Sequence, residues 1–190
     1  MKKFFSLFSF TGVIICFIMA LHFTACHQSK PVTLQQQTDT AVVITSDYWD
    51  DIIEKVWPAV NSHYPKYSFY EANGMLTKVD QEIWGVKHNT FRAVFGNPFE
   101  MSTLLVYVDN DTLKFRVADE PWMGCLYMTP FKVCNLTRAV ELIQKTVNLY
   151  PEGLPVSLSF SIFDIEPKWA IEADDNLHTV CVYSLEVDSE

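Results

Sequence analysis

Residues 102–118 read STLLVYVDNDTLKFRVA, two runs of alternating side chains on either side of a short polar centre. Leu104, Val106 and Val108 share one face of a strand, because side chains along a strand point to opposite faces in turn. The central residues Asp109-Asn110-Asp111 are of the types that tight turns favour. This stretch therefore predicts a β-hairpin, and with it an antiparallel sheet.

A helix is predicted upstream of the hairpin, in the segment DYWDDIIEKVWPAV, residues 47–60. Its apolar residues recur at spacings of three and four, which is typical of one buried helix face. Ser46 precedes the run and is a candidate N-cap. Pro58 predicts that the helix kinks or ends near Trp57. The apolar positions are Trp49, Ile52, Ile53, Val56, Trp57 and Val60.

Between this helix and the hairpin we expect short strands, in the segments YSFYEA, LTKVDQEIWGV and TFRAVFG. Asn73-Gly74 and Gly96-Asn97-Pro98 are expected to separate them, because these residue pairs favour turns.

The same order of elements recurs in the second part of the chain. The segment NLTRAVELIQKTVNLYP begins with Asn135 as a candidate N-cap and ends before Pro151 and Gly153. Three alternating runs follow, VSLSFSIF, KWAIEAD and HTVCVYSLEV, with Asp174-Asp175-Asn176 between the last two. The predicted helix face consists of Leu136, Ala139, Val140, Ile143 and Val147.

A helix followed by strands, twice, predicts an α+β fold. The simplest arrangement is an antiparallel sheet with two helices packed on one face, leaving the other face open. It would be a tandem α-β-β repeat of about 90 residues, with possible halves 42–120 and 121–190.

From Asn135 to the end, the helix, strand and hairpin pattern resembles PepSY-like domains and the β-lactamase-inhibitor-like domains built from tandem copies. Domains of this kind are typically extracytoplasmic, and several bind or inhibit proteins through the open face of the sheet. The resemblance implies a binding or inhibitory module.

The N-terminus indicates export. Lys2 and Lys3 precede an uncharged apolar run over residues 4–25, and Phe23-Thr24-Ala25-Cys26 resembles a bacterial lipobox. We therefore predict a lipoprotein signal peptide over residues 1–25 and lipidation of Cys26, which would anchor the protein to the bacterial cell envelope. The alternative is that the run is retained as a membrane-spanning anchor. Either way, the rest of the chain lies outside the cytoplasm.

Residues 26–41 are predicted to be the lipidated cysteine and a flexible tether, and residues 42–190 a single globular domain. All 23 acidic residues follow residue 25, whereas two of the 14 basic residues precede it, so the exported part carries a net charge of about −11. Such a charge disfavours nucleic acid as a partner.

Three cysteines follow Cys26 in the chain. Cys125 and Cys134 are a possible disulfide, which would contribute about 3 kcal/mol if relaxed, and Cys181 would be left over. The alternative is three reduced, buried thiols.

We expect no catalytic residues, no metal site and no cofactor. Cys134 stands at a predicted helix N-terminus, which could activate a thiol, and this keeps an envelope thiol enzyme or hydrolase open as an alternative. The aspartate-rich segments 109–111 and 174–176 are interpreted as turns rather than calcium loops.

Residues 119–131, DEPWMGCLYMTPF, combine apolar side chains with neither a helical nor a strand period. This segment either plugs one end of the core or forms a contact surface for a protein. The candidate partner-binding residues are Trp122, Met123, Tyr127, Met128 and Phe131. Taken together, the sequence predicts a lipid-anchored, non-catalytic binding or inhibitory module for a protein or peptide, with a structural role in a surface assembly as a further alternative.

Overall fold

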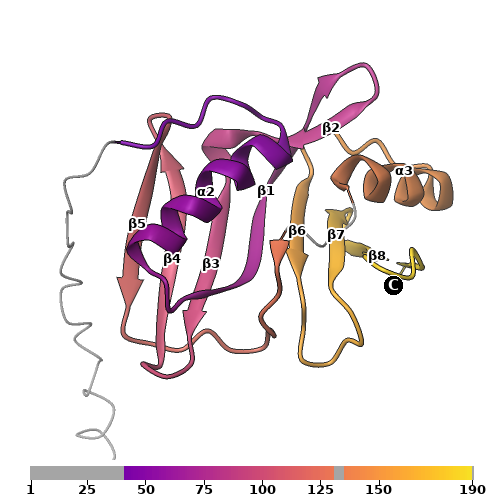
Figure 1. The fold of residues 1–190 in the computed structure, drawn as a ribbon. Helices are drawn as coiled ribbons and strands as arrows, with labels where there is room; N and C mark the ends of the chain where they lie inside the picture. Colours follow the sequence, from indigo (N-terminus) through magenta and orange to yellow (C-terminus); the bar gives the residue numbers. More distant parts are fainter. Residues whose placement is uncertain (1–40, 131–134, 190) are drawn as a thin grey trace, which may run out of the picture. The chain divides into compact units, whose positions relative to one another are not determined.

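The computed structural model describes residues 41–130 and 135–189. In these residues the chain forms two α-helices and a nine-stranded open antiparallel sheet, which makes it an α+β fold (Figure 1). Helix α2 (Trp49–His63) precedes β1 (Ser68–Asp80), β2 (Ile83–Val86), the 3-10 turn η1 (His88–Thr90), β3 (Arg92–Asn97), β4 (Ser102–Asp109) and β5 (Thr112–Ala118). Helix α3 (Leu136–Val147) precedes β6 (Pro155–Ser159), β7 (Lys168–Ala173), β8 (Asn176–Cys181) and β9 (Val187–Ser189).

The strands lie in the order β5-β4-β3-β1-β6-β7-β8-β9, and β2 pairs with the end of β1. The first strand after each helix therefore lies at the centre, where β1 and β6 pair antiparallel. Each half of the chain then proceeds outward from this pair to its own edge. This arrangement is what a duplicated helix-and-strands unit would produce, although the duplication itself stays a prediction.

Both helices cover the same face of the sheet. One row of cross-strand neighbours, Ala93, Ala72, Leu158, Trp169 and Val180, runs through both halves and lies in the core. The buried faces of α2 and α3 belong to the same core cluster as this row. The predicted arrangement of two helices on one face is therefore confirmed.

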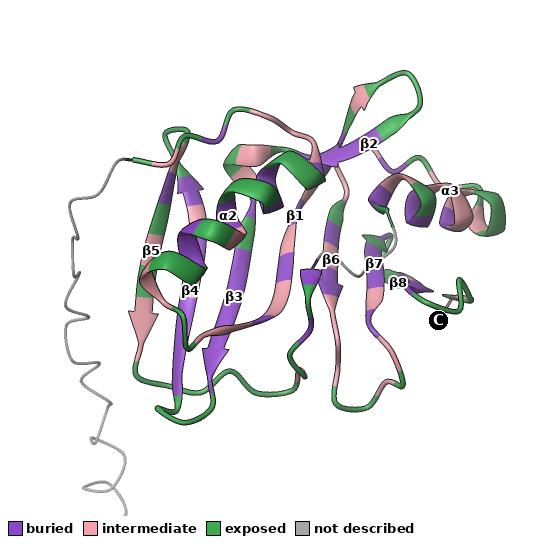
Figure 2. Cartoon of the chain, in the orientation of Figure 1, coloured by how far each residue is buried: buried purple, intermediate pink, exposed green. Residues whose placement is uncertain are grey.

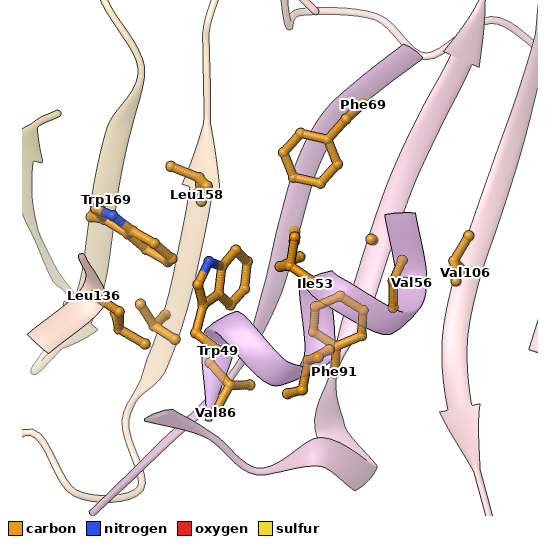
Figure 3. Packing of buried hydrophobic residues seen from close by; sticks show 14 of the residues in the cluster. Trp49, Ile53, Val56, Phe69, Val86, Phe91, Val106, Leu136, Leu158 and Trp169 are labelled. Carbon is orange, nitrogen blue, oxygen red and sulfur yellow. The ribbon is translucent and has the colours of Figure 1, made fainter. Parts of the chain in front are cut away.

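Trp49 joins the two halves of this core (Figure 3). Its ring makes edge contacts with Phe91 at 6.0 Å and with Trp169 of β7 at 4.9 Å between centroids. Aromatic pairs of this geometry add roughly 0.5–1.5 kcal/mol beyond the area they bury. Truncation of Trp169, which is fully buried, would open a cavity that reaches both halves.

Several local predictions are confirmed. The hairpin of β4 and β5 turns at Asn110-Asp111, and α3 begins at Asn135, whose side chain accepts a hydrogen bond from the Thr137 amide at 2.7 Å. The buried side of α3 has the four predicted residues Leu136, Ala139, Val140 and Ile143, with Val147 partly buried.

Other predictions were wrong. Helix α2 does not end near Trp57 but continues through Pro58 to His63, because Ala59 and Val60 beyond the proline are buried in the core while Pro58 itself faces solvent. The kink at Pro58 stays a prediction. Ser46 is not the N-cap; the helix begins after Tyr48, and the Ser46 hydroxyl accepts the Tyr48 amide at 3.2 Å.

Asn73-Gly74 does not separate two strands either, since both residues lie inside β1. A Cβ at Gly74 would stand 2.3 Å from Val86 Cγ1, so glycine is needed there for the close approach of β2 rather than for a turn. The run HTVCVYSLEV, predicted as one strand, is divided into β8 and β9 by a loop.

Candidate functional site

The loops at the two ends of the sheet differ in length and in chemistry. At one end, β4 is joined to β5, and β7 to β8, by two-residue turns whose central residues all have positive φ: Asn110, Asp111, Asp174 and Asp175. We call this the turn end. At the opposite end lie four longer segments, 98–101, 119–130, 160–167 and 182–186, which we call the apolar loop end.

The strand register places these four segments together. Cross-strand neighbours Gly96, Thr103 and Ala118 mark the ends of β3, β4 and β5, and Ser159 and Lys168 mark those of β6 and β7. Because antiparallel strands alternate in direction, the connections that leave these residues emerge at the same end of the sheet. In Figure 1 the β3–β4 and β6–β7 loops are both seen at the lower edge.

Most of the exposed large apolar side chains of the described residues belong to the apolar loop end, where Figure 2 shows the loops largely in the exposed colour. Phe99 is 92% exposed, Phe163 and Ile165 are each 90% exposed, and Met123 is 78% exposed. The others on these segments are Met101, Trp122, Leu126, Tyr127, Ile162, Tyr183 and Leu185. Elsewhere in residues 41–130 and 135–189, only Val43, Ile83, Tyr150 and Leu177 are exposed to a comparable degree.

Two of these residues adopt a backbone conformation that is uncommon for apolar side chains. Met101 has φ 51° and Leu185 has φ 58°. Outside glycine, positive φ is mainly adopted by asparagine and aspartate, and strained residues of this kind cluster at functional sites. The apolar loop end thus has strained backbone as well as exposed apolar surface.

Hydrogen bonds join segment 119–130 to the start of β1 and to the residues that follow β6. The Ile162 amide donates to the Gly124 carbonyl at 2.9 Å, and the Leu126 amide donates to the Phe160 carbonyl at 2.5 Å. Further along, the Met128 amide donates to the Phe69 carbonyl at 2.9 Å. These bonds fix the exposed side chains of this segment against the β6–β7 loop.

The β6–β7 loop is in turn fixed to the β8–β9 loop by Glu166. One of its carboxylate oxygens accepts the amides of Tyr183 at 3.2 Å and Ser184 at 3.0 Å, and the Ser184 hydroxyl at 2.8 Å. The backbone bond from Ser184 is the main reason why the pKa of Glu166 is lowered. Three of the four segments are therefore connected through polar contacts.

The sequence-predicted binding residues divide into three groups in this structure. Trp122, Met123 and Tyr127 are exposed at the apolar loop end. Met128 is only 8% exposed and belongs to the core, so it cannot contribute much contact surface. Phe131 lies outside the described residues, as do Cys26 and Cys134.

Cys125 is described and has no disulfide partner among the described residues; its Sγ donates to Glu71 Oε2 at 3.6 Å. Burial, followed by the negative charge of Glu71, raises the pKa of Cys125 to about 11. That shift suppresses the thiolate, which is the form that attacks an electrophile. The disulfide with Cys134 and the reactivity of Cys134 stay predictions.

The apolar segments other than 119–131 were missed at the level of sequence. Phe99, Phe163, Ile165, Tyr183 and Leu185 stand in short segments where each looks like an ordinary loop residue. Apolar residues between acidic ones in SIFDIEP and YSLEVDSE are the only local signal, and the strand order is needed to bring them together.

Two cavities lie away from the apolar loop end. One, of about 460 Å³, adjoins the end of α3 and the β7–β8 turn, where His178 has a buried Nδ1 without a hydrogen-bond partner among the described residues. The other, also about 460 Å³, lies on the open sheet face around Asn73, Arg92 and Glu172. Within residues 41–130 and 135–189, we find no cluster of side chains that could hold a metal ion.

Comparisons with known proteins give little further guidance. No protein-family model and no curated protein sequence matches this chain. Among solved structures, it is similar to a protein of Clostridium difficile 630 that is provisionally described as a lipoprotein, with 12% identity, a TM-score of 0.45, and coverage of 83% of this chain and 99% of that chain. A likeness of this extent leaves the function to be argued from the chain itself.

Proposed function

We propose that this protein is a lipid-anchored binding module of the bacterial cell envelope, and that it holds a protein partner through the apolar loop end. The observation that carries the proposal is the concentration of exposed apolar side chains on four loops at one end of the sheet. Contiguous apolar surface of this kind marks interaction sites in soluble domains, whereas single exposed apolar residues do not.

The dimensions of this surface favour a protein over a small molecule. From the β3–β4 loop to the β8–β9 loop the surface crosses strands spaced about 4.8 Å apart, which gives a length of roughly 30 Å. Small ligands instead bind in enclosed cavities, and both cavities described above lie elsewhere. Aromatic residues and methionine, which are enriched at the centres of protein interfaces, make up much of the exposed set.

Binding rather than catalysis is supported by the state of Cys125. Cys125 lies in segment 119–130 of the apolar loop end, but the pKa of its thiol is raised, which is opposite to the shift that a nucleophile requires. The resemblance of the second half to PepSY-like and inhibitor-like domains agrees with a binding role, although those domains use the open sheet face.

The envelope location is proposed from the lipobox-like residues at Cys26. Within the described ranges, no helix is long and apolar enough to cross a membrane. Labelling cells with a clickable fatty acid tests the anchor: label should appear on the wild-type chain and be lost in Cys26→Ala. Absence of label from both proteins would support the alternative that residues 4–25 are retained as a membrane-spanning anchor.

Affinity capture from solubilised envelopes tests the binding role. The double variant Met123→Ser/Phe163→Ser should recover at least about tenfold less partner than wild type, because it removes apolar contacts worth about 1.4 kcal/mol or more. The matched control Ile83→Ser/Leu177→Ser carries the same kind of change away from the apolar loop end and should recover wild-type amounts. Equal recovery by all three proteins would exclude the apolar loop end as the binding surface.

A further inference from the structure

The apolar loop end is also strongly acidic. Its described residues include six carboxylates and no lysine, arginine or histidine. The six are Glu100, Asp119, Glu120, Asp164, Glu166 and Glu186. This composition selects among the surfaces that could cover the exposed apolar side chains.

Among the described residues, only part of this charge is neutralised. Lys66 pairs with Glu100 at 2.9 Å, and Lys168 pairs with Asp164 at 3.0 Å. Glu166 is occupied by the amides and hydroxyl of the β8–β9 loop. In contrast, Asp119, Glu120 and Glu186 are exposed and have no ion pair with a described residue.

We infer that the partner surface is cationic as well as apolar, with lysine or arginine side chains that face Asp119, Glu120 and Glu186. This inference rests on the proposed function and specifies its partner class. Complementary charge at the rim of an interface directs encounter and excludes wrong partners, while buried apolar anchors supply most of the affinity.

The same charges argue against two other occupants. An anionic bilayer would be repelled by the carboxylates, which lie on the same loops as the apolar side chains. A second copy of this chain, docked through the same surface, would bring two sets of Asp119, Glu120 and Glu186 together, none of which has an ion pair with a described residue. A cationic protein surface is the occupant that satisfies both the apolar and the acidic features.

The test uses the full-length chain in nanodiscs of zwitterionic lipid and three synthetic helical peptides as probes. The peptides share one apolar face of leucine and tryptophan and carry lysine, glutamine or glutamate on the other face. Fluorescence anisotropy at low and at high salt measures their affinities. The lysine peptide should bind at least about tenfold more tightly than the glutamine peptide at low salt, with the difference reduced at high salt.

A charge-reversal pair locates the effect. In Asp119→Lys/Glu120→Lys/Glu186→Lys the preference for the lysine peptide should be lost. The control Glu82→Lys/Asp109→Lys/Glu172→Lys makes the same change in net charge on exposed residues away from the apolar loop end, and should retain the preference. Met123→Ser/Phe163→Ser should weaken binding of all the peptides.

Each of the remaining outcomes would refute one of the two proposals or both. Equal affinity for the lysine and glutamine peptides would refute the cationic partner but leave the apolar binding surface standing. Loss of lysine-peptide binding only in the control triple variant would refute both the cationic partner and the apolar loop end as the binding surface. A fluorescent amino acid at Phe163 that shifts to the blue in nanodiscs without peptide would indicate a bilayer as the occupant, and pairing of chains through this surface would indicate a second copy.

Discussion

The two ends of the sheet are built from the same strands, but the loops that connect the strands differ in length and in composition. At the turn end, Asp and Asn occupy positive-φ positions, and the connections are as short as the hairpins allow. At the apolar loop end, the connections are longer, carry exposed apolar and acidic side chains, and hold Met101 and Leu185 in strained backbone. Under the proposed function, the first set of connections is shaped by folding and the second by an interaction.

If this comparison is correct, substitutions at the turn end should mainly change stability. Replacing Asp174 and Asp175 with valine should lower the free energy of unfolding by about 2–4 kcal/mol in total, because β-branched residues are strained at φ 50° and 63°. Replacing the same pair with Asn-Gly should leave stability unchanged or slightly raised. Urea unfolding measures both, and a valine variant as stable as wild type would contradict the role assigned to these turns.

A smaller effect on stability is expected from substitution of His88, whose imidazole contacts the turn end. His88 Nδ1 lies 2.5 Å from Asp47 Oδ1, and Nε2 lies 3.0 Å from Asp111 Oδ1 in the β4–β5 turn. The hydrogen bond to Asp47 is the main cause that raises the pKa of His88. A raised pKa in the folded state means that the protonated imidazole stabilises the fold.

The stabilisation should therefore be present in full below pH about 6.5, the ordinary pKa of histidine, and be lost as the pH rises through the raised value. His88→Asn should lower the free energy of unfolding by up to about 1 kcal/mol near pH 5.5 and by less near pH 9, as measured by urea unfolding at each pH. Asp111→Asn, which removes one of the two charges, should show the same trend with a smaller amplitude. A cost that grows with pH would refute the pairing.

At the apolar loop end, substitutions should hardly change stability. Phe163→Ser and Ile165→Ser each remove a side chain that is almost fully exposed, so each should alter the free energy of unfolding by about 0.5 kcal/mol or less. Thermal unfolding of the two variants beside Phe69→Ser, whose side chain is fully buried, gives the contrast. If either loop variant lowered the free energy of unfolding by more than about 1.5 kcal/mol, its side chain would contribute to packing of the fold and would not be free to contact a partner.

The smallest effect concerns Cys125, in segment 119–130 of the apolar loop end. With a pKa of about 11, roughly one thiol in a thousand is ionised at pH 8, so alkylation by iodoacetamide should be slow. Glu71→Gln removes the nearby negative charge and should lower the pKa and speed labelling severalfold, without a change in stability. Peptide mapping by mass spectrometry follows Cys125 alone.

The same measurement tests the predicted disulfide. Labelling of Cys125 only after treatment with a reductant would support its pairing with Cys134, whereas slow labelling without reductant would support the free thiol. Rapid labelling of wild type at pH 8 would contradict the raised pKa.

Much of the fold could be predicted from local sequence because each signal was local. The β4–β5 hairpin, the cap at Asn135 and the apolar stripe of α3 depend on neighbouring residues only. The errors came from positions that tertiary contacts decide. Packing of Ala59 and Val60 carries α2 past Pro58, and the approach of Val86 explains Gly74 inside a strand.

The candidate site was harder to predict for the same reason. Segment 119–131 stood out because it is long and aromatic, and Trp122, Met123 and Tyr127 are indeed exposed. Met128 could not be separated from them, because its burial in the core depends on tertiary packing and not on the neighbouring residues. Phe99, Phe163 and Tyr183 are brought to the same surface only by the order of the strands, which the local sequence does not encode.

Photo-crosslinking in intact cells would show whether the apolar loop end contacts a partner. A photoreactive phenylalanine analogue would be placed at Met123, Phe163 or Tyr183 at the apolar loop end, and at Ile83, Tyr150 or Leu177 elsewhere. We expect the first three positions to yield adducts with one common partner and the other three to yield none. Adducts of similar yield from both sets, or from the second set alone, would contradict the assignment of the apolar loop end as the binding surface.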